Sequence, residues 1–199
     1  MRPIVEIQLI RPGLFFWQGY DAKVKTDLGC CAVATPSGLV FIDPLPLARE
    51  PLEELASQFA PAGIVLTNAN HERASADFAR RFGVPVHAHA EARGEVAADR
   101  WIESDDATIG ETVRVIHLPG FAKGEIALHA GGDCLMLGDA LINAEPYGFA
   151  MLPDKYCADP KLARVSLQKL LPLQVELITF AHGLPIVSHA RRRLETLLT

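Results

Sequence analysis

The stretch IVLTNANHER, residues 64–73, leads from a brief apolar strand into a helix, and it narrows the choice of fold more than any other part of the chain. Residues 63–66 are apolar, and residues 71–82 place apolar side chains at helical spacing before Gly83, a common helix stop. A strand followed by a helix is typical of α/β folds. The polar loop between them therefore lies at a strand end.

Upstream of this stretch the pattern is that of antiparallel strands. Short runs rich in β-branched and aromatic residues are separated by Pro12-Gly13 and Pro36-Ser37-Gly38, which are turn signals. The runs are residues 4–10, 14–17, 31–35 and 39–42. After Asp43-Pro44 the period changes, and residues 47–59 predict a helix.

Downstream, a second block of strands is also completed by helices. We expect strands at residues 84–87, 113–117, 126–129, 134–137 and 177–180, and helices at 88–98, 159–171 and 188–198. Residues 139–159 form the longest irregular stretch, which either lies near a pocket or is a plain surface excursion. Two strand-rich blocks with helices predict an α/β fold in which two sheets pack face to face between helices.

Composition predicts one globular domain, residues 1–199. The chain has 199 residues, 49% of them hydrophobic, which suits a single sizeable core. Its net charge of -5 and the absence of a basic stripe argue against nucleic-acid and membrane-surface binding, and the Arg191–Arg193 cluster is interpreted as an ordinary helix surface. No secretory signal or membrane span is recognised, and four cysteines without a C-x-x-C pair suggest free thiols, so we expect a cytoplasmic protein.

Five short segments occur in the order and at the spacing of the metallo-β-lactamase superfamily, which the chain resembles over nearly its whole length. They are residues 40–43 (VFID), 64–67 (IVLT), 115–120 (VIHLPG) with Gly124, 137–139 (LGD) and 180–183 (FAHG). Each segment alone is weak evidence, whereas five in order indicate the fold. The resemblance implies a four-layer αββα sandwich, in agreement with the periodicity.

The resemblance also implies where metal ligands belong, since the family binds two metal ions through a T-H-x-H-x-D-H loop and a histidine after Pro-Gly. The family's ligand positions are occupied here by Asn68, Asn70, Glu72, Arg73 and, after Pro119-Gly120, Phe121. Amide oxygens are poor ligands for zinc, and a phenyl ring has no lone pair to offer. We therefore expect the dinuclear zinc site of the family to be lost.

Three potential ligands remain at the second metal position. Glu72, Asp139 and His182 stand where the family has its aspartate, its bridging aspartate and its last histidine, so they are the candidate catalytic and metal residues. They could hold one Zn, Mn or Fe ion with an open position for water. Alternatively no metal binds: Glu72 serves the start of a helix, and Asp139 pairs with His182 as a remnant of the site.

The other polar candidates receive structural interpretations. His71 occupies the variable position of the loop and is expected to face away from the metals, with a hydrogen bond at the helix start. Asp43 matches a family position that braces the loop. His87 and His89 share one strand face without a third ligand in their motif, and His117 is expected to pack in its strand. Cys157 could be a nucleophile only if His182 lay beside it, which no pattern indicates.

Two functional hypotheses follow, with a third and weaker one beside them. The first is a relative without standard hydrolase activity that binds a small molecule or a protein through the remnant groove. The second is a mononuclear metal-dependent hydrolase of an ester, thioester, lactone or amide, and the third is an unnamed metal-free reaction. A small-molecule ligand and a homo-oligomer are both compatible with the sequence. Fold resemblance alone does not choose between these functions.

Overall fold

The computed structural model describes residues 1–199 and is built on two large sheets and one small one. The first sheet has seven strands in the order β1-β2-β3-β4-β5-β6-β7. These are β1 (Gln8–Arg11), β2 (Leu14–Asp21), β3 (Thr26–Thr35), β4 (Gly38–Ile42), β5 (Pro61–Val65), β6 (Val86–His89) and β7 (Arg100–Ile102). The first four strands pair antiparallel, and β4 to β7 pair parallel.

The second sheet has five strands in the order β14-β11-β10-β9-β8, and a two-stranded sheet lies beside it. The strands are β8 (Thr108–Ile109), β9 (Val113–His117), β10 (Ile126–Ala130), β11 (Cys134–Leu137) and β14 (Leu177–Phe180), with the hairpin of β12 (Leu141–Ala144) and β13 (Gly148–Met151). Neighbours β11 and β14 run parallel, so their carboxyl ends meet at one edge. That edge holds the candidate site.

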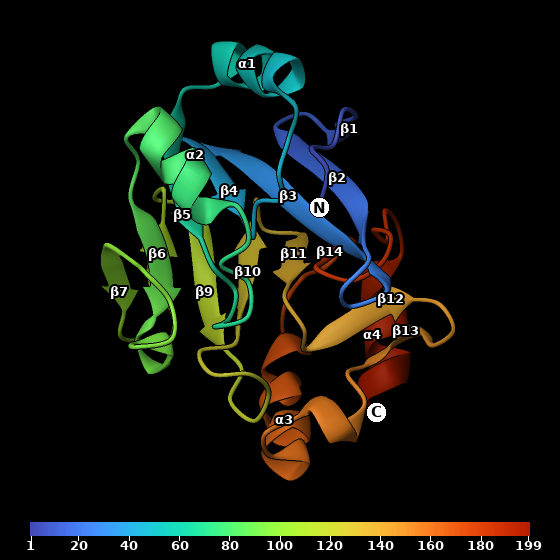
Figure 1. Ribbon diagram of the computed structural model, residues 1–199. Coiled ribbons are helices and arrows are strands. Elements are labelled where there is room, and N and C mark those ends of the chain that lie inside the picture. The colour runs from blue at the N-terminus through green and yellow to red at the C-terminus, as the bar shows by residue number, and fades with distance from the viewer.

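Helices cover the outer face of each sheet, which confirms the αββα sandwich. Figure 1 shows α1 (Arg49–Gln58) and α2 (Ser75–Phe82) on the side of the seven-stranded sheet, and α3 (Pro160–Leu167) and α4 (Ala190–Leu198) on the opposite side. Three buried apolar clusters fill the spaces between layers: one between the sheets, one under α1 and α2, and one under α3 and α4. Each sheet face is thus buried by period-two alternation of apolar side chains.

The adjacent cysteines illustrate this alternation. Cys30 lies in the cluster under α1 and α2, whereas Cys31 lies between the sheets, which confirms that their side chains face opposite sides of β3. All four cysteines of the chain are free thiols. Burial raises the pKa of the thiols of Cys30 and Cys31, so neither is a reactive thiolate.

Two predicted elements are wrong and have local causes. Residues 88–98 do not form a helix: a single 3-10 turn, Ala90–Ala92, ends before Gly94, whose φ of 82° turns the chain. The chain then adds β7 to the sheet edge, with Asp99 donating its N–H to Val86 O. Helix α2 begins at Ser75, because the preceding loop ends at Arg73 with a positive φ of 43°.

The stretch 139–159 is not irregular throughout, since it contains the β12–β13 hairpin and a 3-10 turn at Asp154–Tyr156. Its Pro146 and Gly148 belong to the hairpin turn and the start of β13. The stretch does line a hollow, as one of the two alternatives predicted. None of the four α-helices is long and apolar enough to span a membrane.

Candidate metal centre

The polar residues of the site come from loops at one edge of the two sheets. Asp43 follows β4, the loop 66–73 follows β5, Asp139 follows β11 and His182 follows β14. Because the carboxyl ends of parallel strands meet at a shared edge, residues far apart in the sequence converge here.

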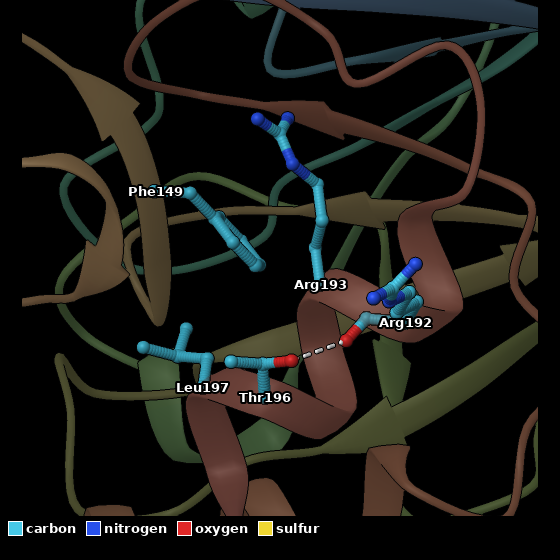
Figure 2. A pocket seen from close by; sticks show the side chains of 5 residues that line it. All are labelled: Phe149, Arg192, Arg193, Thr196 and Leu197. Atoms are coloured by element: carbon cyan, nitrogen blue, oxygen red, sulfur yellow. Dashed lines mark hydrogen bonds between the residues drawn. The ribbon is translucent and has the colours of Figure 1, made fainter.

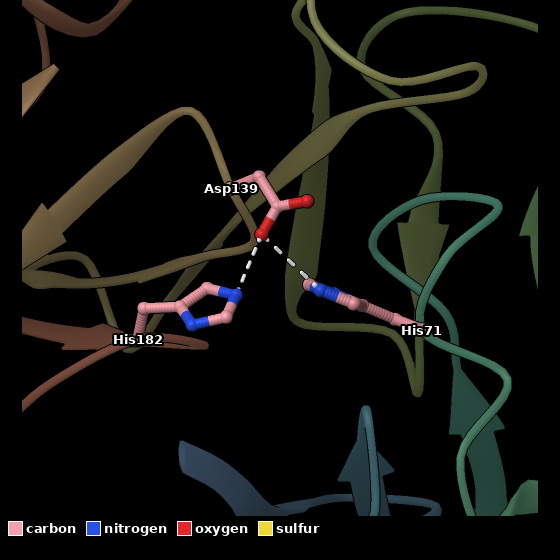
Figure 3. Close-up of side chains that lie close together, drawn as sticks. All are labelled: His71, Asp139 and His182. Atoms are coloured by element: carbon pink, nitrogen blue, oxygen red, sulfur yellow. Dashed lines mark ion pairs between the residues drawn. The ribbon is translucent and has the colours of Figure 1, made fainter. Parts of the chain in front are cut away.

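Three of these side chains form the centre of the site (Figure 3). His71 Nε2 lies 3.2 Å from Asp139 Oδ1, and His182 Nε2 lies 3.0 Å from the same oxygen. One ligand atom from each residue lies within 4.8 Å of the other two. Asp139 Oδ1 is buried and receives no well-aligned hydrogen bond, although two ring nitrogens face it. A buried carboxylate oxygen without a donor is a position suited to a cation.

His71 is held from its other side by a buried carboxylate. Its Nδ1 lies 2.8 Å from Asp43 Oδ2 and 2.9 Å from Thr67 Oγ1. Asp43 in turn accepts the Thr67 N–H at 2.8 Å, so the carboxylate is fixed to the strand-end loop. Metal-ligating histidines in proteins usually donate their second ring N–H to a carboxylate in this way.

The electrostatics of the metal-free site are those of a paired ion cluster. Burial opposes the ionisation of Asp139, but the neighbouring charge of His71 and the contact with His182 outweigh it and hold the pKa of this carboxyl well below its usual value. Burial and Arg73 act to lower the pKa of His71, whereas Asp139 and Asp43 raise it to about 9. His71 is therefore cationic between two carboxylates when no metal is bound.

A second buried carboxylate, Glu125, is linked to the centre through an amide. Asn68 Nδ2 donates to Glu125 Oε2 at 2.7 Å and to Asp139 Oδ2 at 3.1 Å, and its Oδ1 accepts the Asn70 N–H at 2.8 Å. Glu125 Oε1 accepts the Ala140 N–H at 3.0 Å. Burial and the charge of Asp139 raise the pKa of Glu125. Sequence reasoning missed Glu125, which carries no motif and directly precedes β10.

Glu72 does not join Asp139 and His182, so the predicted ligand set is corrected at this position. Its carboxylate instead accepts the Ala97 N–H at 3.1 Å, in the segment between the 3-10 turn at Ala90–Ala92 and β7. The expectation that His71 faces away is also wrong, since His71 occupies the centre in place of Glu72. The turn between residues 68 and 71, closed by the His71 N–H and Asn68 O, sets which side chain points inward.

Arg73 and Phe121 contact the surrounding fold and do not contact the three residues of the centre. Arg73 Nη1 donates to Gly29 O at 2.7 Å and to Asp43 O at 3.1 Å, which ties the loop to β3. Phe121 is 1% exposed and packs in the apolar cluster under α3 and α4. Both therefore stabilise the walls of the site, and neither offers a ligand atom to the centre.

The loop that carries His182 is held by several elements at once. Gly29 of β3 donates its N–H to Ala181 O at 2.8 Å, and Leu28 forms an isolated bridge with His182. Asn143 of β12 donates its N–H to His182 O at 2.9 Å. A Cβ at Gly183 would overlap the backbone of Asn143, so this close approach requires glycine. The position of His182 thus depends on all three sheets.

A model of the family described as "Metallo-beta-lactamase superfamily" matches residues 7–199. The chain belongs to the metallo-beta-lactamase superfamily. Solved metallo-beta-lactamases share its fold at low sequence identity. The enzyme from Pontibacter korlensis is 18% identical, with 96% of this chain and 98% of that chain covered and a TM-score of 0.72.

Two further solved structures extend this likeness. The BLEG-1 B3 metallo-beta-lactamase is 21% identical over 89% of this chain and 95% of its own, with a TM-score of 0.71. The protein TTHA1623, solved in a di-iron-bound form, is 24% identical over 89% of this chain and 96% of its own, with a TM-score of 0.64. No curated protein sequence matches the chain.

Members of the metallo-beta-lactamase superfamily typically depend on metal, and the residues at this centre fit one ion. Two imidazoles and one carboxylate converge, the oxygen they share receives no well-aligned hydrogen bond, and Asp43 orients one of the rings. Asp139 and His182, both predicted from the sequence, are brought together. The third member of the group is His71.

Two hollows on the surface of this chain differ in whether they reach the candidate metal centre. One of about 600 Å³ opens onto Asp139 and His182, and its walls include Lys25, Tyr147 and Tyr156. The other, of about 350 Å³, lies between β13 and α4 (Figure 2). It is lined by Phe149, Arg192, Arg193, Thr196 and Leu197. Only the first hollow reaches the candidate metal centre, so it is the candidate substrate groove.

Proposed function

We propose that the chain binds one divalent metal ion, Zn, Mn or Fe, through His71, Asp139 and His182, and hydrolyses a small ester, thioester, lactone or amide. The observation that carries this proposal is the convergence of two imidazole nitrogens on one buried carboxylate oxygen, at 3.2 and 3.0 Å. Two histidines and one carboxylate are a ligand set that zinc and iron sites use.

A single ion is proposed because the neighbouring family positions offer no further imidazole. Both ends of the Asn68 amide are committed, its nitrogen to two carboxylates and its oxygen to the Asn70 N–H. Phe121 directs an apolar ring into the core. These contacts support the loss of the dinuclear zinc site that the resemblance implies.

The residues of the chain have separable roles in this proposal. When bound, a divalent ion supplies Lewis acidity and lowers the pKa of water to near neutrality. Asp43 fixes the orientation of His71, and Arg73 fixes Asp43 through its carbonyl oxygen. Glu125 is fully buried and positions Asn68 and Asp139 without reaching the groove. It is therefore a positioning residue and has no access to substrate.

The groove suits a small molecule with an apolar part. Its rim carries the exposed side chains of Val24, Tyr147 and Tyr156, which are 59%, 52% and 60% exposed. Lys25 lies on the same rim, where a cation favours a substrate with negative charge. A volume of about 600 Å³ is in the range of small-molecule sites.

A second candidate function is metal-free binding through the same groove. The observation that favours it is the double ion pair of His71, whose pKa is raised to about 9 by Asp139 and Asp43 against the effect of burial. In that state the protonated His71 ring already forms ion pairs with both carboxylates. The chain would then bind a small molecule or a protein partner without hydrolysing it.

Metal analysis separates the two functions. Protein purified without chelator is expected to contain about one equivalent of transition metal, and Asp139→Asn is expected to contain almost none. Glu72→Gln is the matched control, because this carboxylate belongs to the same loop region but bonds Ala97 instead of the centre. Hydrolysis of p-nitrophenyl acetate should disappear with chelator and return with metal. Wild-type protein that remains metal-free after incubation with Zn, Mn and Fe would overturn the hydrolase proposal.

A further inference from the structure

A second group of ligand-type side chains lies outside the groove, where β6 and β9 end. His89 closes β6, Glu91 lies in the 3-10 turn that follows, and His117 closes β9. One ligand atom from each lies within 4.8 Å of the other two. We call these three residues the peripheral cluster. None of them lines the candidate substrate groove.

The two imidazoles of the peripheral cluster are held face to face. Their ring centroids are 3.9 Å apart and their planes differ by 19°. His117 Nε2 lies 3.1 Å from Glu91 Oε2, so the carboxylate already contacts one ring. His89 is 6% exposed and its ring is fixed by burial, whereas the side chain of Glu91 is 51% exposed. Because Glu91 is half exposed, a cation can approach the cluster from solvent, and a small rotation of one ring would direct both imidazoles toward it.

The backbone on both sides of the cluster is anchored. His117 donates its N–H to Asp105 Oδ1 at 2.5 Å, and its carbonyl oxygen accepts from Lys169 Nζ at 2.8 Å. Next to His89, Gly124 approaches the Cβ atoms of Ala92 and His89 so closely that it would have no space for a larger residue without movement. Anchored backbones reduce the entropy that a ligand must remove on binding.

Among the charged residues around the peripheral cluster, the Glu91 carboxylate has no lysine or arginine partner and is available to a cation. Arg93 pairs with Glu103, and Lys169 pairs with Asp105, so these charges are neutralised locally. Glu91 contacts only His117 and has no lysine or arginine partner. His89 Nδ1 accepts the N–H of Glu91 at 3.4 Å, a long hydrogen bond that an incoming cation can displace.

We propose that His89, Glu91 and His117 form a second metal site that binds Zn²⁺ and joins the two large sheets. Two imidazoles and one carboxylate are a zinc ligand set, and the exposed side leaves room for water as a further ligand. β6 belongs to the seven-stranded sheet and β9 to the five-stranded sheet. An ion held here links the two sheets directly and stabilises the native state by mass action.

The test titrates Zn²⁺ into chelator-stripped protein and follows the heat of binding and the thermal midpoint. Asp139→Asn, which disables the candidate metal centre, isolates the peripheral cluster, and it is expected to bind one equivalent of Zn²⁺ and to gain thermal stability. Adding His117→Gln should weaken that binding at least tenfold and remove the thermal gain. His129→Gln is the matched control, since this exposed histidine of neighbouring β10 contacts only Gln174 O.

A parallel titration guards against misfolding of the double variant. Glu91→Gln alters only an exposed carboxylate in otherwise wild-type protein, so folding is retained. The affinity of the peripheral cluster for Zn²⁺ should fall, while the affinity of the candidate metal centre is unchanged. Failure of this proposal is distinct from failure of the proposed function, because the two clusters share no residue. Zn²⁺ binding by Asp139→Asn that is absent, or that is unchanged by His117→Gln, would refute the peripheral site.

Discussion

The candidate metal centre and the peripheral cluster contain the same ligand types, two imidazoles and one carboxylate. They differ in the group that hydrogen-bonds to a ring nitrogen of the histidine. At the centre, His71 presents one nitrogen to Asp139 while its other nitrogen faces the Asp43 carboxylate, which favours the tautomer that a metal needs. At the peripheral cluster, His89 Nδ1 instead faces the N–H of Glu91 at 3.4 Å. A backbone donor favours the opposite tautomer, so metal binding must displace it.

Equal ligand sets can therefore differ in metal affinity through the residues that support them. Asp139 is also far less exposed than Glu91, with side-chain exposures of 12% and 51%, so its charge is screened less by water. We therefore expect the centre to bind a divalent ion more tightly than the peripheral cluster. The predictions below test that order.

The largest effect is expected for Asp139→Ala. Removal of the carboxylate that both histidines contact should weaken metal binding at the centre more than about 100-fold. This loss exceeds the roughly 10- to 100-fold loss typical for a residue that only supports a ligand. Equilibrium dialysis against a competing chelator measures this change. Comparable metal affinity in the variant and the wild type would remove the distinction between the two clusters.

Phe121→His tests whether an added imidazole alone can enlarge the centre. Phe121 is 1% exposed in an apolar cluster, so the substitution should lower the free energy of unfolding by about 2–4 kcal/mol through lost packing and a buried polar ring. It should add no second equivalent of metal. Urea denaturation and metal analysis check the two statements, and a variant that binds two ions with undiminished stability contradicts them.

Asp43→Asn isolates the supporting carboxylate. The amide keeps the shape of Asp43 but weakens its hold on the His71 ring, so metal affinity at the centre should fall about 10- to 100-fold. Asp43 also accepts hydrogen bonds from Thr67, whose loss would lower stability. The thermal midpoint of the variant, measured in the presence of a chelator, reports that loss separately from the change in metal affinity. An unchanged affinity would mean that the His71 tautomer does not limit binding.

The smallest effect is expected for Glu91→Gln, which should reduce Zn²⁺ affinity at the peripheral cluster by less than about tenfold. The carboxylate is half exposed and contributes one ligand among imidazoles, so water can replace part of its contribution. Calorimetric titration of the chelator-stripped protein measures it. A loss as large as that for Asp139→Ala at the centre would reverse the order proposed above.

The sequence predicted the layered fold because its periodicity is local. Alternation in β3 separates Cys30 from Cys31, and the strand at residues 113–117 has the predicted bounds. The helix predicted at residues 88–98 was wrong because Ala88 and His89 belong to β6 and pair with β7, a tertiary effect, and Gly94 turns the chain after one 3-10 turn.

The site was predicted only in part, and the physical reason is the conformation of the loop. Asp139 and His182 follow strands whose ends converge, so their meeting could be expected from the resemblance. The inward direction of His71 depends on a turn at residues 68–71 and on the left-handed conformation of Arg73. Glu125 was missed because burial of a carboxylate just before a strand depends on distant partners, here Asn68 and Ala140.

The anchoring of the His182 loop has a consequence for how the proposed metal centre would fail. Because β3, β11 and β12 each hold residues 181–183 by backbone hydrogen bonds, any slippage of one layer over another displaces an imidazole of the centre. The geometry of the proposed metal centre is then more sensitive to the alignment of the layers than the fold is. Under gradually harsher conditions, metal affinity would fall before secondary structure is lost.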